Sequence, residues 1–241
     1  MTKQRSIKNV FHVIYTKSNY RMISWDQQKY STEIVLENKM VAPWAYILKF
    51  KRSFEFSAGQ VVGLGVNTVL EPRLYSIASG ETDEYVEILY TEKPEGQLTP
   101  MLSLLQNGDK VLVTQPIGTF TDYSDSSIFI ATGTGIAPFV SFIKSVRRNN
   151  ITLIHGVRTS DYFYFSELLK KQLGDNYIQC CTGFQSSEYF NGRVTKYIKE
   201  SPVNPNKKYY LCGVAEMVVD VRDILISKGV PFSNIISEIY F

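Results

Sequence analysis

The sequence predicts a two-part fold, an antiparallel β-barrel followed by a doubly wound parallel α/β domain. Residues 30–124 hold short strand-like runs between turns and a single helical stretch, which is typical of a small barrel. Residues 125–241 alternate strand-like and helix-like segments, the pattern of a parallel sheet covered by helices. At residues 127–146 a buried strand meets a glycine-rich turn and then an apolar helix, which indicates a βα unit. Residues 1–29 are expected to form a separate N-terminal arm.

Composition limits the classes of function. A chain of 241 residues is long enough for two domains, each with its own core. The net charge of +3 is too small to indicate nucleic-acid binding, and it permits an acidic protein partner. No apolar run approaches the roughly 20 residues that a membrane-spanning helix needs. We therefore expect neither a nucleic-acid partner nor an integral membrane segment.

The cysteines and histidines indicate no metal site. The three cysteines, Cys180, Cys181 and Cys212, are an odd number without metal-type spacing, which favours reduced thiols and a cytoplasmic location. His12 and His155 are far apart in the chain, and His155 stands in an apolar run. We interpret His155 as a packed strand residue rather than a catalyst, and we expect no bound metal.

The first 25 residues carry basic side chains and no acidic one before Asp26. This pattern is compatible with a transit peptide, a solvated arm or an additional edge strand at residues 10–15. We favour a solvated arm or an edge strand.

The barrel is expected to contain six strands and one helix. The strand candidates are residues 32–37, 45–50, 60–66, 74–78, 84–91 and 110–115, and the helix candidate is 98–105. A polar turn at residues 122–126 is expected to separate the two domains.

The α/β domain is expected to contain five strands and four helices in alternation. The strand candidates are residues 127–131, 151–157, 177–182, 208–212 and 234–240. The helix candidates are residues 136–148, 162–173, 193–200 and 215–228.

The turn Thr132-Gly133-Thr134-Gly135 carries the first chemical signal. Glycines permit a sharp turn and let a phosphate approach the backbone, and the following helix offers unpaired N–H groups. Pro138 falls in the first helical turn, where a missing N–H costs little. The pattern is Gly-Thr-Gly-x-x-Pro rather than the usual dinucleotide fingerprint. It indicates a dinucleotide pyrophosphate site, with a strand-to-helix turn that binds nothing as the alternative.

Two motifs in the predicted barrel also indicate a site for a phosphate group. Arg73-Leu74-Tyr75-Ser76 places a cation, an aromatic ring and a hydroxyl on one strand, with Arg73 and Tyr75 on the same side. Such a strand is either an ordinary half-exposed strand or a phosphate fork beside a stacking ring. In the stretch 95–100, Thr99 resembles a helix N-cap followed by Pro100. This second anion site, on the other domain, would let two dinucleotides meet at an interface.

Taken together, the motifs resemble the ferredoxin–NADP reductase family of flavoproteins, in particular the bacterial ferredoxin/flavodoxin reductases. The resemblance runs from about residue 31 to residue 241. It is carried by five motifs in the family's order, Arg73-x-Tyr75-Ser76, Gly96-Gln97-Leu98-Thr99, Gly133-Thr134-Gly135-Ile136-Ala137-Pro138, Cys212-Gly213 and Glu238-Ile239-Tyr240-Phe241. The motifs are weak singly, but their joint order and spacing are specific.

The resemblance implies roles for the matching residues, in an enzyme that binds FAD in the barrel and NADP(H) in the α/β domain. The implied FAD-binding residues are Arg73, Leu74, Tyr75, Ser76, Gly96, Gln97, Leu98, Thr99, Tyr240 and Phe241. The implied NADP-binding residues are Thr132, Gly133, Thr134, Gly135, Ile136, Pro138, Arg158, Arg193, Cys212 and Gly213. The implied catalytic residues are Ser76, Cys212, Glu238 and Tyr240.

Coenzyme choice is left open between NADP(H) and NAD(H). Arg158 and Arg193 match basic positions that would bind a 2′-phosphate in the family. The family commonly has a further arginine after the third strand of this domain, whereas residues 182–185 here read Thr-Gly-Phe-Gln. The missing cation weakens the expected preference for NADP(H), which we still place ahead of NAD(H).

By resemblance, the chain is expected to move electrons between NADP(H) and an acidic carrier protein, ferredoxin or flavodoxin. A basic cluster of Lys49, Lys51 and Arg52 would steer such a partner, although such clusters often serve only solvation. The alternatives are an NADH- or NADPH-dependent flavin reductase component for a separate oxygenase or haem partner, and a non-catalytic or electron-branching subunit of a larger complex. We expect a monomer.

Overall fold

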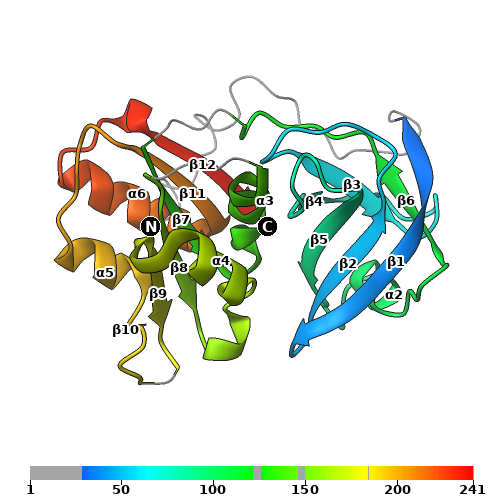
Figure 1. The fold of residues 1–241 in the computed structure, drawn as a ribbon, viewed down its shortest axis with the longest axis horizontal. Helices are drawn as coiled ribbons and strands as arrows, with labels where there is room; N and C mark the ends of the chain where they lie inside the picture. The colour runs from blue at the N-terminus through cyan, green and yellow to red at the C-terminus, as the bar shows by residue number, and fades with distance from the viewer. Residues whose placement is uncertain (1–28, 122–125, 146–149, 184, 241) are drawn as a thin grey trace, which may run out of the picture.

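The computed structural model describes residues 29–121, 126–145, 150–183 and 185–240, and it consists of two six-stranded sheets side by side (Figure 1). The first sheet is antiparallel and the second is parallel, with helices on both faces. The predicted fold class is confirmed. The exact domain limits stay a prediction, because residues 122–125 at the expected boundary and most of the expected N-terminal arm lie outside the described residues.

The first sheet closes into a barrel. Its order is β4-β3-β6-β1-β2-β5, and an isolated bridge between Ile77 and Ile88 joins the two ends of this order. The Ala78 N–H donates to the Glu87 carbonyl at 2.8 Å beside this bridge. The elements are β1 (Tyr30–Ala42), β2 (Ala45–Lys51), β3 (Val61–Gly65), β4 (Arg73–Ser76), β5 (Tyr85–Thr91), α2 (Thr99–Ser103) and β6 (Lys110–Thr114). The closure places β4, which carries the Arg-x-Tyr-Ser motif, beside β5.

The second sheet has the order β10-β9-β8-β7-β11-β12, and its strand pairings are parallel. Its strands are β7 (Ser127–Thr132), β8 (Thr152–Val157), β9 (Tyr177–Cys181), β10 (Phe190–Asn191), β11 (Lys208–Val214) and β12 (Ile235–Tyr240). The chain leaves β7 toward β8 and later returns to the other side of β7 as β11. The topological switch point, where open α/β sheets bind ligands, therefore lies between β7 and β11.

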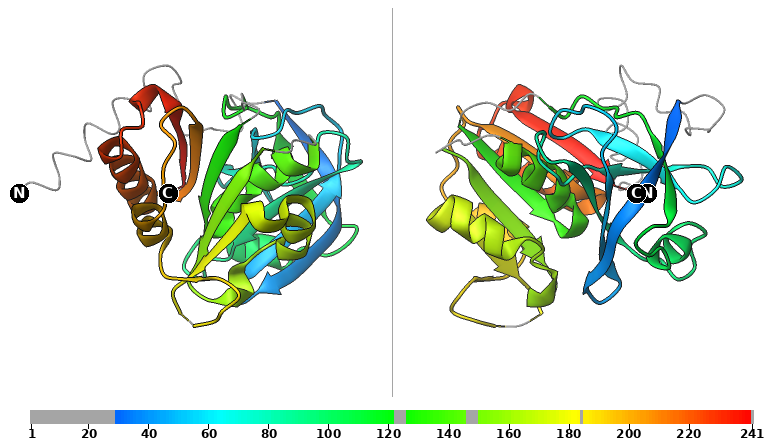
Figure 2. Two further views of the ribbon diagram at one scale, coloured as in Figure 1. Left: turned by 60° about the vertical axis from the view of Figure 1, so that its left-hand side comes forward. Right: turned by 45° about the vertical axis from the view of Figure 1, so that its right-hand side comes forward.

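Helices cover both faces of the parallel sheet (Figure 2). Apolar side chains of α3 (Ala137–Ser145) and α4 (Ser166–Leu173) pack on the face that contains Phe129 and Leu153. Those of α5 (Val194–Glu200) and α6 (Ala215–Ser227) pack on the face that contains Ile130 and Leu211. The domain also contains the short 3-10 turns η2 (Gly133–Ile136), η3 (Ser160–Tyr162), η4 (Gly174–Asn176) and η5 (Phe232–Asn234). In the part of the chain that the structure describes, no helix is long and apolar enough to cross a membrane.

The predicted elements are present, with a few changes at their ends. β1 extends well beyond the predicted run to Ala42, where a tight turn leads into β2. The two-residue strand β10 was not predicted, because so short a segment has no periodicity to detect. The helix predicted from residue 162 begins only at Ser166, because η3 and the left-handed residue Phe165 (φ 58°) precede it.

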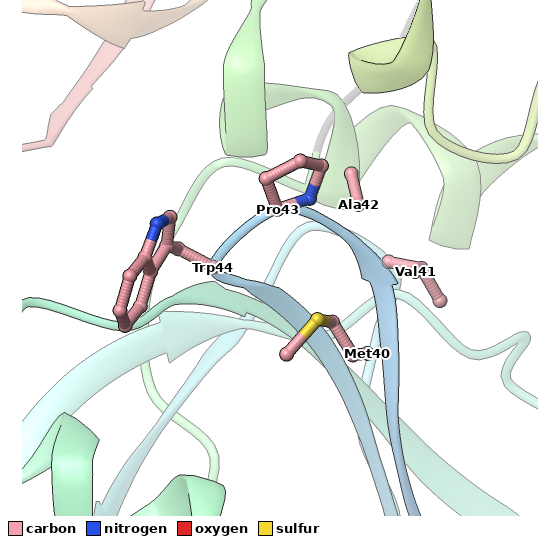
Figure 3. Close-up of a pocket in the computed structure, with 5 residues that line it drawn as sticks. All are labelled: Met40, Val41, Ala42, Pro43 and Trp44. Carbon is pink, nitrogen blue, oxygen red and sulfur yellow. The ribbon is translucent and has the colours of Figure 1, made fainter.

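The tip of the β1–β2 hairpin reaches the second domain. Its residues Met40, Val41, Ala42, Pro43 and Trp44 line a shallow apolar hollow, shown in Figure 3. Trp44 has a left-handed backbone (φ 62°) and is 54% exposed. The Tyr162 hydroxyl donates to the Pro43 carbonyl at 3.2 Å. The hairpin therefore forms a polar contact between the two sheets.

Another contact between the sheets is formed by α3. The Ser141 hydroxyl donates to the Ser79 carbonyl at 2.6 Å, and the Glu81 N–H donates to the Ser145 hydroxyl at 2.9 Å. Beside them, Lys144 forms an ion pair with the buried Glu87 of β5. The helix that follows the glycine turn is thus held against the barrel.

Candidate active site between the two sheets

The glycine turn and the end of β11 meet at the switch point. A Cβ added to Gly135 would lie 2.4 Å from the Cys212 carbonyl oxygen, and one added to Gly213 would lie 2.3 Å from the Thr132 hydroxyl oxygen. Gly213 also has φ +147°, which disfavours any side chain. These approaches require glycine at both positions. The Gly133–Pro138 and Cys212-Gly213 motifs, predicted separately from the sequence, therefore lie against each other at the switch point.

The turn itself is a 3-10 segment that leads directly into α3. Gly133 has φ +55°, and a Cβ added there would meet no atom within 4 Å, so its backbone faces open space. Thr132, Gly133 and Thr134 are half-buried, whereas Gly135 and Ile136 are buried. Pro138 lies in the first turn of α3, as predicted. Backbone N–H groups at such a turn are suited to an anionic group.

On the barrel side, β4 presents the Arg-x-Tyr-Ser motif toward the junction of the sheets. Arg73 and Leu74 are exposed, Tyr75 is half-buried and Ser76 is buried. Burial raises the pKa of Tyr75 to about 12, although the charge of Arg73 acts in the opposite direction. The Tyr75 ring packs edge-on against Tyr90, with centroids 6.3 Å apart. The strand therefore holds a neutral aromatic ring in place beside an exposed cation.

Ser76 and Glu238 join the two domains at the centre of the site. The Ser76 hydroxyl donates to Glu238 Oε2 at 3.2 Å, across 162 residues of chain. Glu238 pairs in register with Cys212 of β11, so the carboxyl stands beside the nucleotide motifs. Burial raises the pKa of Glu238 to about 7, and the hydrogen bond from Ser76 acts to lower it. A carboxyl with such a pKa can hold or release a proton near neutral pH.

The stretch before α2 differs from its prediction. Leu98, not Thr99, is the N-cap of α2, and no side chain caps the helix. The Thr99 hydroxyl instead accepts the Lys93 N–H at 2.8 Å and ties a tight turn in which the Gly96 N–H donates to the Lys93 carbonyl. The sequence pattern was misleading because a threonine before proline fits an N-cap and a first helical residue equally well.

Arg158 and Arg193 lie at the carboxyl edge of the parallel sheet and are both exposed. The Gly183 N–H donates to the Arg158 carbonyl at 2.6 Å, and the Gly192 N–H next to Arg193 donates to the Cys181 carbonyl at 2.8 Å. Among the described residues, neither guanidinium has a carboxylate within ion-pair distance. Two exposed cations therefore lie on the side of the switch point where β8 and β9 end.

Gly183, in the stretch where a third cation was sought, has no room for a side chain. A Cβ at position 183 would lie 2.4 Å from the Arg158 carbonyl oxygen. Backbone atoms leave no room for a side chain there unless the loop moves. Phe184, next in the chain, lies outside the described residues.

The C-terminal tail is described only in part. β12 ends at Tyr240, whose backbone pairs with Val214. The Tyr240 side chain and Phe241 lie outside the described residues, so their predicted positions against the flavin stay predictions.

The basic cluster expected to steer a partner is largely neutralised. Lys49 Nζ lies 2.9 Å from Glu37 and 3.5 Å from Glu87. Arg52 forms an ion pair with Glu55 and donates to the Phe54 and Asp83 carbonyls. Lys51 is exposed. A run of cations in the sequence does not reveal acidic partners on neighbouring strands, and this cluster does not support steering.

The described residues contain no group of His, Cys, Asp and Glu that could hold a metal ion, and Cys180, Cys181 and Cys212 are buried thiols. His155 is fully buried in β8, as its interpretation as a packed strand residue requires.

The ion pair between Lys144 and Glu87, which joins the two domains, was not predicted from the sequence. No local sequence pattern marks two residues that come together only when the chain folds.

Comparisons with known proteins agree with this architecture. The family profile described as "Oxidoreductase NAD-binding domain" matches residues 129–223. The ferredoxin–NADP reductase of Pseudomonas aeruginosa is 29% identical over 215 residues, covering 76% of this chain and 83% of that protein. The reductase component of propane 2-monooxygenase from Mycolicibacterium smegmatis is 28% identical, covering 74% of this chain and 57% of that protein.

A solved structure shows the same fold. The crystal structure of a ferredoxin NADP+ reductase from Neisseria gonorrhoeae with bound FAD and NADP superposes with a TM-score of 0.79. The superposition covers 88% of this chain and 99% of the Neisseria gonorrhoeae chain, and the two sequences are 23% identical. The barrel and the parallel sheet therefore have the arrangement found in that structure.

Proposed function

We propose that this chain is an oxidoreductase of the ferredoxin–NADP reductase family that transfers electrons between NADP(H) and a small one-electron carrier protein through bound FAD. The observation that carries the proposal is the hydrogen bond between Ser76 and Glu238, 3.2 Å long, where the barrel meets the nucleotide motifs. It places a proton-holding pair between the two domains, where a flavin and a nicotinamide could both contact it.

The barrel residues fit FAD. Arg73 is exposed and, within the described residues, has no carboxylate partner, so it is available to bind a pyrophosphate. The Tyr75 ring is held by its edge-on contact with Tyr90, and it would pack against one face of a flavin ring. Leu98 is buried and the Gly96 N–H is used in a tight turn, so the backbone N–H groups of residues 97–99 would hold phosphate oxygens. When bound, FAD would supply a ring that accepts a hydride and passes electrons on singly.

The α/β domain fits a nicotinamide dinucleotide. The open backbone at Gly133 and the following N–H groups suit a pyrophosphate, and the close approach of Gly135 to the Cys212 backbone leaves no room for a side chain at the switch point. Arg158 and Arg193 would bind a 2′-phosphate with their exposed guanidinium groups. We therefore assign NADP(H), and the absence of a third cation in residues 182–185 keeps NAD(H) as the alternative.

The residues between the domains would position the reacting atoms. Hydride transfer needs donor and acceptor about 3–3.5 Å apart and aligned. Cys212, fixed by pairing of β11 with β7 and β12, would support the nicotinamide, and Ser76 would orient the flavin edge. Glu238, with its pKa of about 7, would supply or receive a proton through the Ser76 hydroxyl. Tyr240 would cover the flavin until nicotinamide replaces it.

Anaerobic stopped-flow mixing with NADPH and, in parallel, NADH tests the proposal. Rapid loss of the visible flavin absorbance with NADPH alone supports the NADP(H) assignment. Equal or faster reduction by NADH would retain the chemistry and change the donor. A purified protein that takes up no FAD would refute the catalytic function.

The partner is proposed to be an acidic ferredoxin or flavodoxin. Its support is the similarity to a bacterial ferredoxin–NADP reductase. Reduction of a purified ferredoxin that falls steeply with salt would support this partner. We also propose a cytoplasmic monomer.

A second candidate is a reductase component for a separate oxygenase. The similarity to the propane 2-monooxygenase reductase component favours it, although this chain spans 57% of that protein. Reduction of an oxygenase or haem protein in preference to ferredoxin would select this candidate. An electron-branching subunit stays the third alternative, which an active isolated chain would exclude.

A further inference from the structure

His155 lies directly beneath the proposed nucleotide turn. It pairs in register with Ala131 of β7, one residue before Thr132, and its side chain is fully buried. The rings of Phe163 and Tyr177 pack around it, with centroids 5.5 Å and 6.2 Å away. Its ring therefore lies below the turn rather than in the space where a ligand would bind.

The ring has one partnered and one unpartnered nitrogen. His155 Nδ1 lies 3.0 Å from the Tyr177 hydroxyl, and Nε2 is buried without a hydrogen-bond partner among the described residues. The Tyr177 hydroxyl carries a proton, because burial raises its pKa well above the usual range, and Gln179 also hydrogen-bonds it. A hydroxyl that donates to Nδ1 leaves the ring proton on Nε2. In this tautomer the buried ring has an N–H donor without a partner among the described residues.

The backbone of Gly133 is the polar group that acts on this ring. Burial lowers the pKa of His155 to about 3, and a backbone interaction with Gly133 acts to raise it. The ring is neutral near neutral pH, so it contributes an N–H dipole and no charge. A buried donor without a partner is costly, and buried donors are nearly always satisfied in a functional state.

We propose that His155 is a positioning residue for nucleotide binding, with Nε2–H donating to the Gly133 carbonyl when a dinucleotide pyrophosphate occupies the turn. The inference deepens the proposed function and rests on it. With the Gly133 carbonyl held by the ring, the N–H groups at the start of the 3-10 turn, those of Gly133 and Thr134, would be left to bind the phosphate. Tyr177 sets the tautomer that makes this donation possible.

The test is binding of two ligands to the FAD-loaded protein by isothermal titration calorimetry. NADP+ spans the pyrophosphate turn, whereas 2′-AMP contacts only the edge with Arg158 and Arg193. We expect His155→Leu and Tyr177→Phe each to weaken NADP+ binding by about three- to tenfold, the loss of one hydrogen bond. Binding of 2′-AMP should not change. His155→Gln, which keeps an N–H donor, should recover part of the loss.

Tyr209→Phe is the matched control. Tyr209 is a buried tyrosine of the same sheet whose hydroxyl bonds the Asn204 backbone away from the turn. We expect it to bind NADP+ like the wild type.

Three results would overturn the inference: unchanged NADP+ affinity in both variants, an equal loss of 2′-AMP binding, or an equal loss in Tyr209→Phe. Failure of the proposed function is distinguishable, because the wild-type protein would then bind neither ligand. Tyr177→Phe removes one oxygen atom only, so it keeps the test valid if His155→Leu does not fold.

Discussion

Replacing Lys144 by methionine should loosen the junction of the two domains. Lys144 of α3 forms an ion pair with Glu87, whose side chain is 7% exposed, and Lys49 Nζ lies 3.5 Å from the other carboxylate oxygen of Glu87. The change removes one positive charge, keeps most of the apolar stem and leaves Glu87 with Lys49 alone.

The structure gives the size of the effect. Removing one partner of a buried pair costs about 3–5 kcal/mol, because the other charge stays buried. Lys49 compensates in part, and its 28% exposed side chain keeps some hydration, so we expect a loss of about 2–3 kcal/mol in the free energy of unfolding. Urea denaturation of the purified protein measures this loss. Because α3 carries the nucleotide turn, flavin reduction should slow as well.

Two further variants make the reasoning refutable. Lys144→Met combined with Glu87→Met removes both charges and should recover most of the lost stability. Lys196→Met breaks an exposed pair with Glu200, 4.0 Å apart, and should cost less than about 0.5 kcal/mol. A double variant as unstable as the single one, or a single variant no worse than Lys196→Met, would show that the buried charge does not control this junction.

Three other changes test the site. Ser76→Ala should retain FAD and slow flavin reduction by about tenfold or more, measured by stopped flow, and an unchanged rate would remove Ser76 from the mechanism. Glu238→Gln should abolish a pH transition of the steady-state rate near the carboxyl pKa of about 7. The same variant should raise the free energy of unfolding by about 1–3 kcal/mol at about pH 8 and leave it unchanged at about pH 4. The reason is that the pKa of Glu238 is higher in the folded than in the unfolded protein, so its ionisation at high pH destabilises the fold, and glutamine cannot ionise. Gly135→Ala should weaken NADP+ binding in calorimetry, since its Cβ would lie 2.4 Å from the Cys212 carbonyl oxygen; wild-type affinity would show that the turn shifts freely.

The local features of the fold were predictable because each depends on residues that are close together in the sequence. Strand runs, the glycine turn before Pro138 and the alternation after residue 125 follow from periodicity and from glycine and proline chemistry. These features predicted the barrel, the parallel sheet and the motif residues on β4 and β7. The N-cap at Thr99 was wrong because the local pattern had two readings, and the actual partner of the threonine hydroxyl, the Lys93 backbone, lies six residues away.

Contacts between distant residues were decided by the tertiary structure alone. Strand order brings β12 beside β11 and closes the barrel at β4, and only then do Ser76 and Glu238 meet across 162 residues. The same packing buries Glu87 against Lys144 and neutralises Lys49. The sequence by itself determined which chemical groups this protein has and on which elements they lie. Which groups share a hydrogen bond, a buried charge or a shifted pKa depended on packing, because desolvation and distance exist only once the two sheets are assembled.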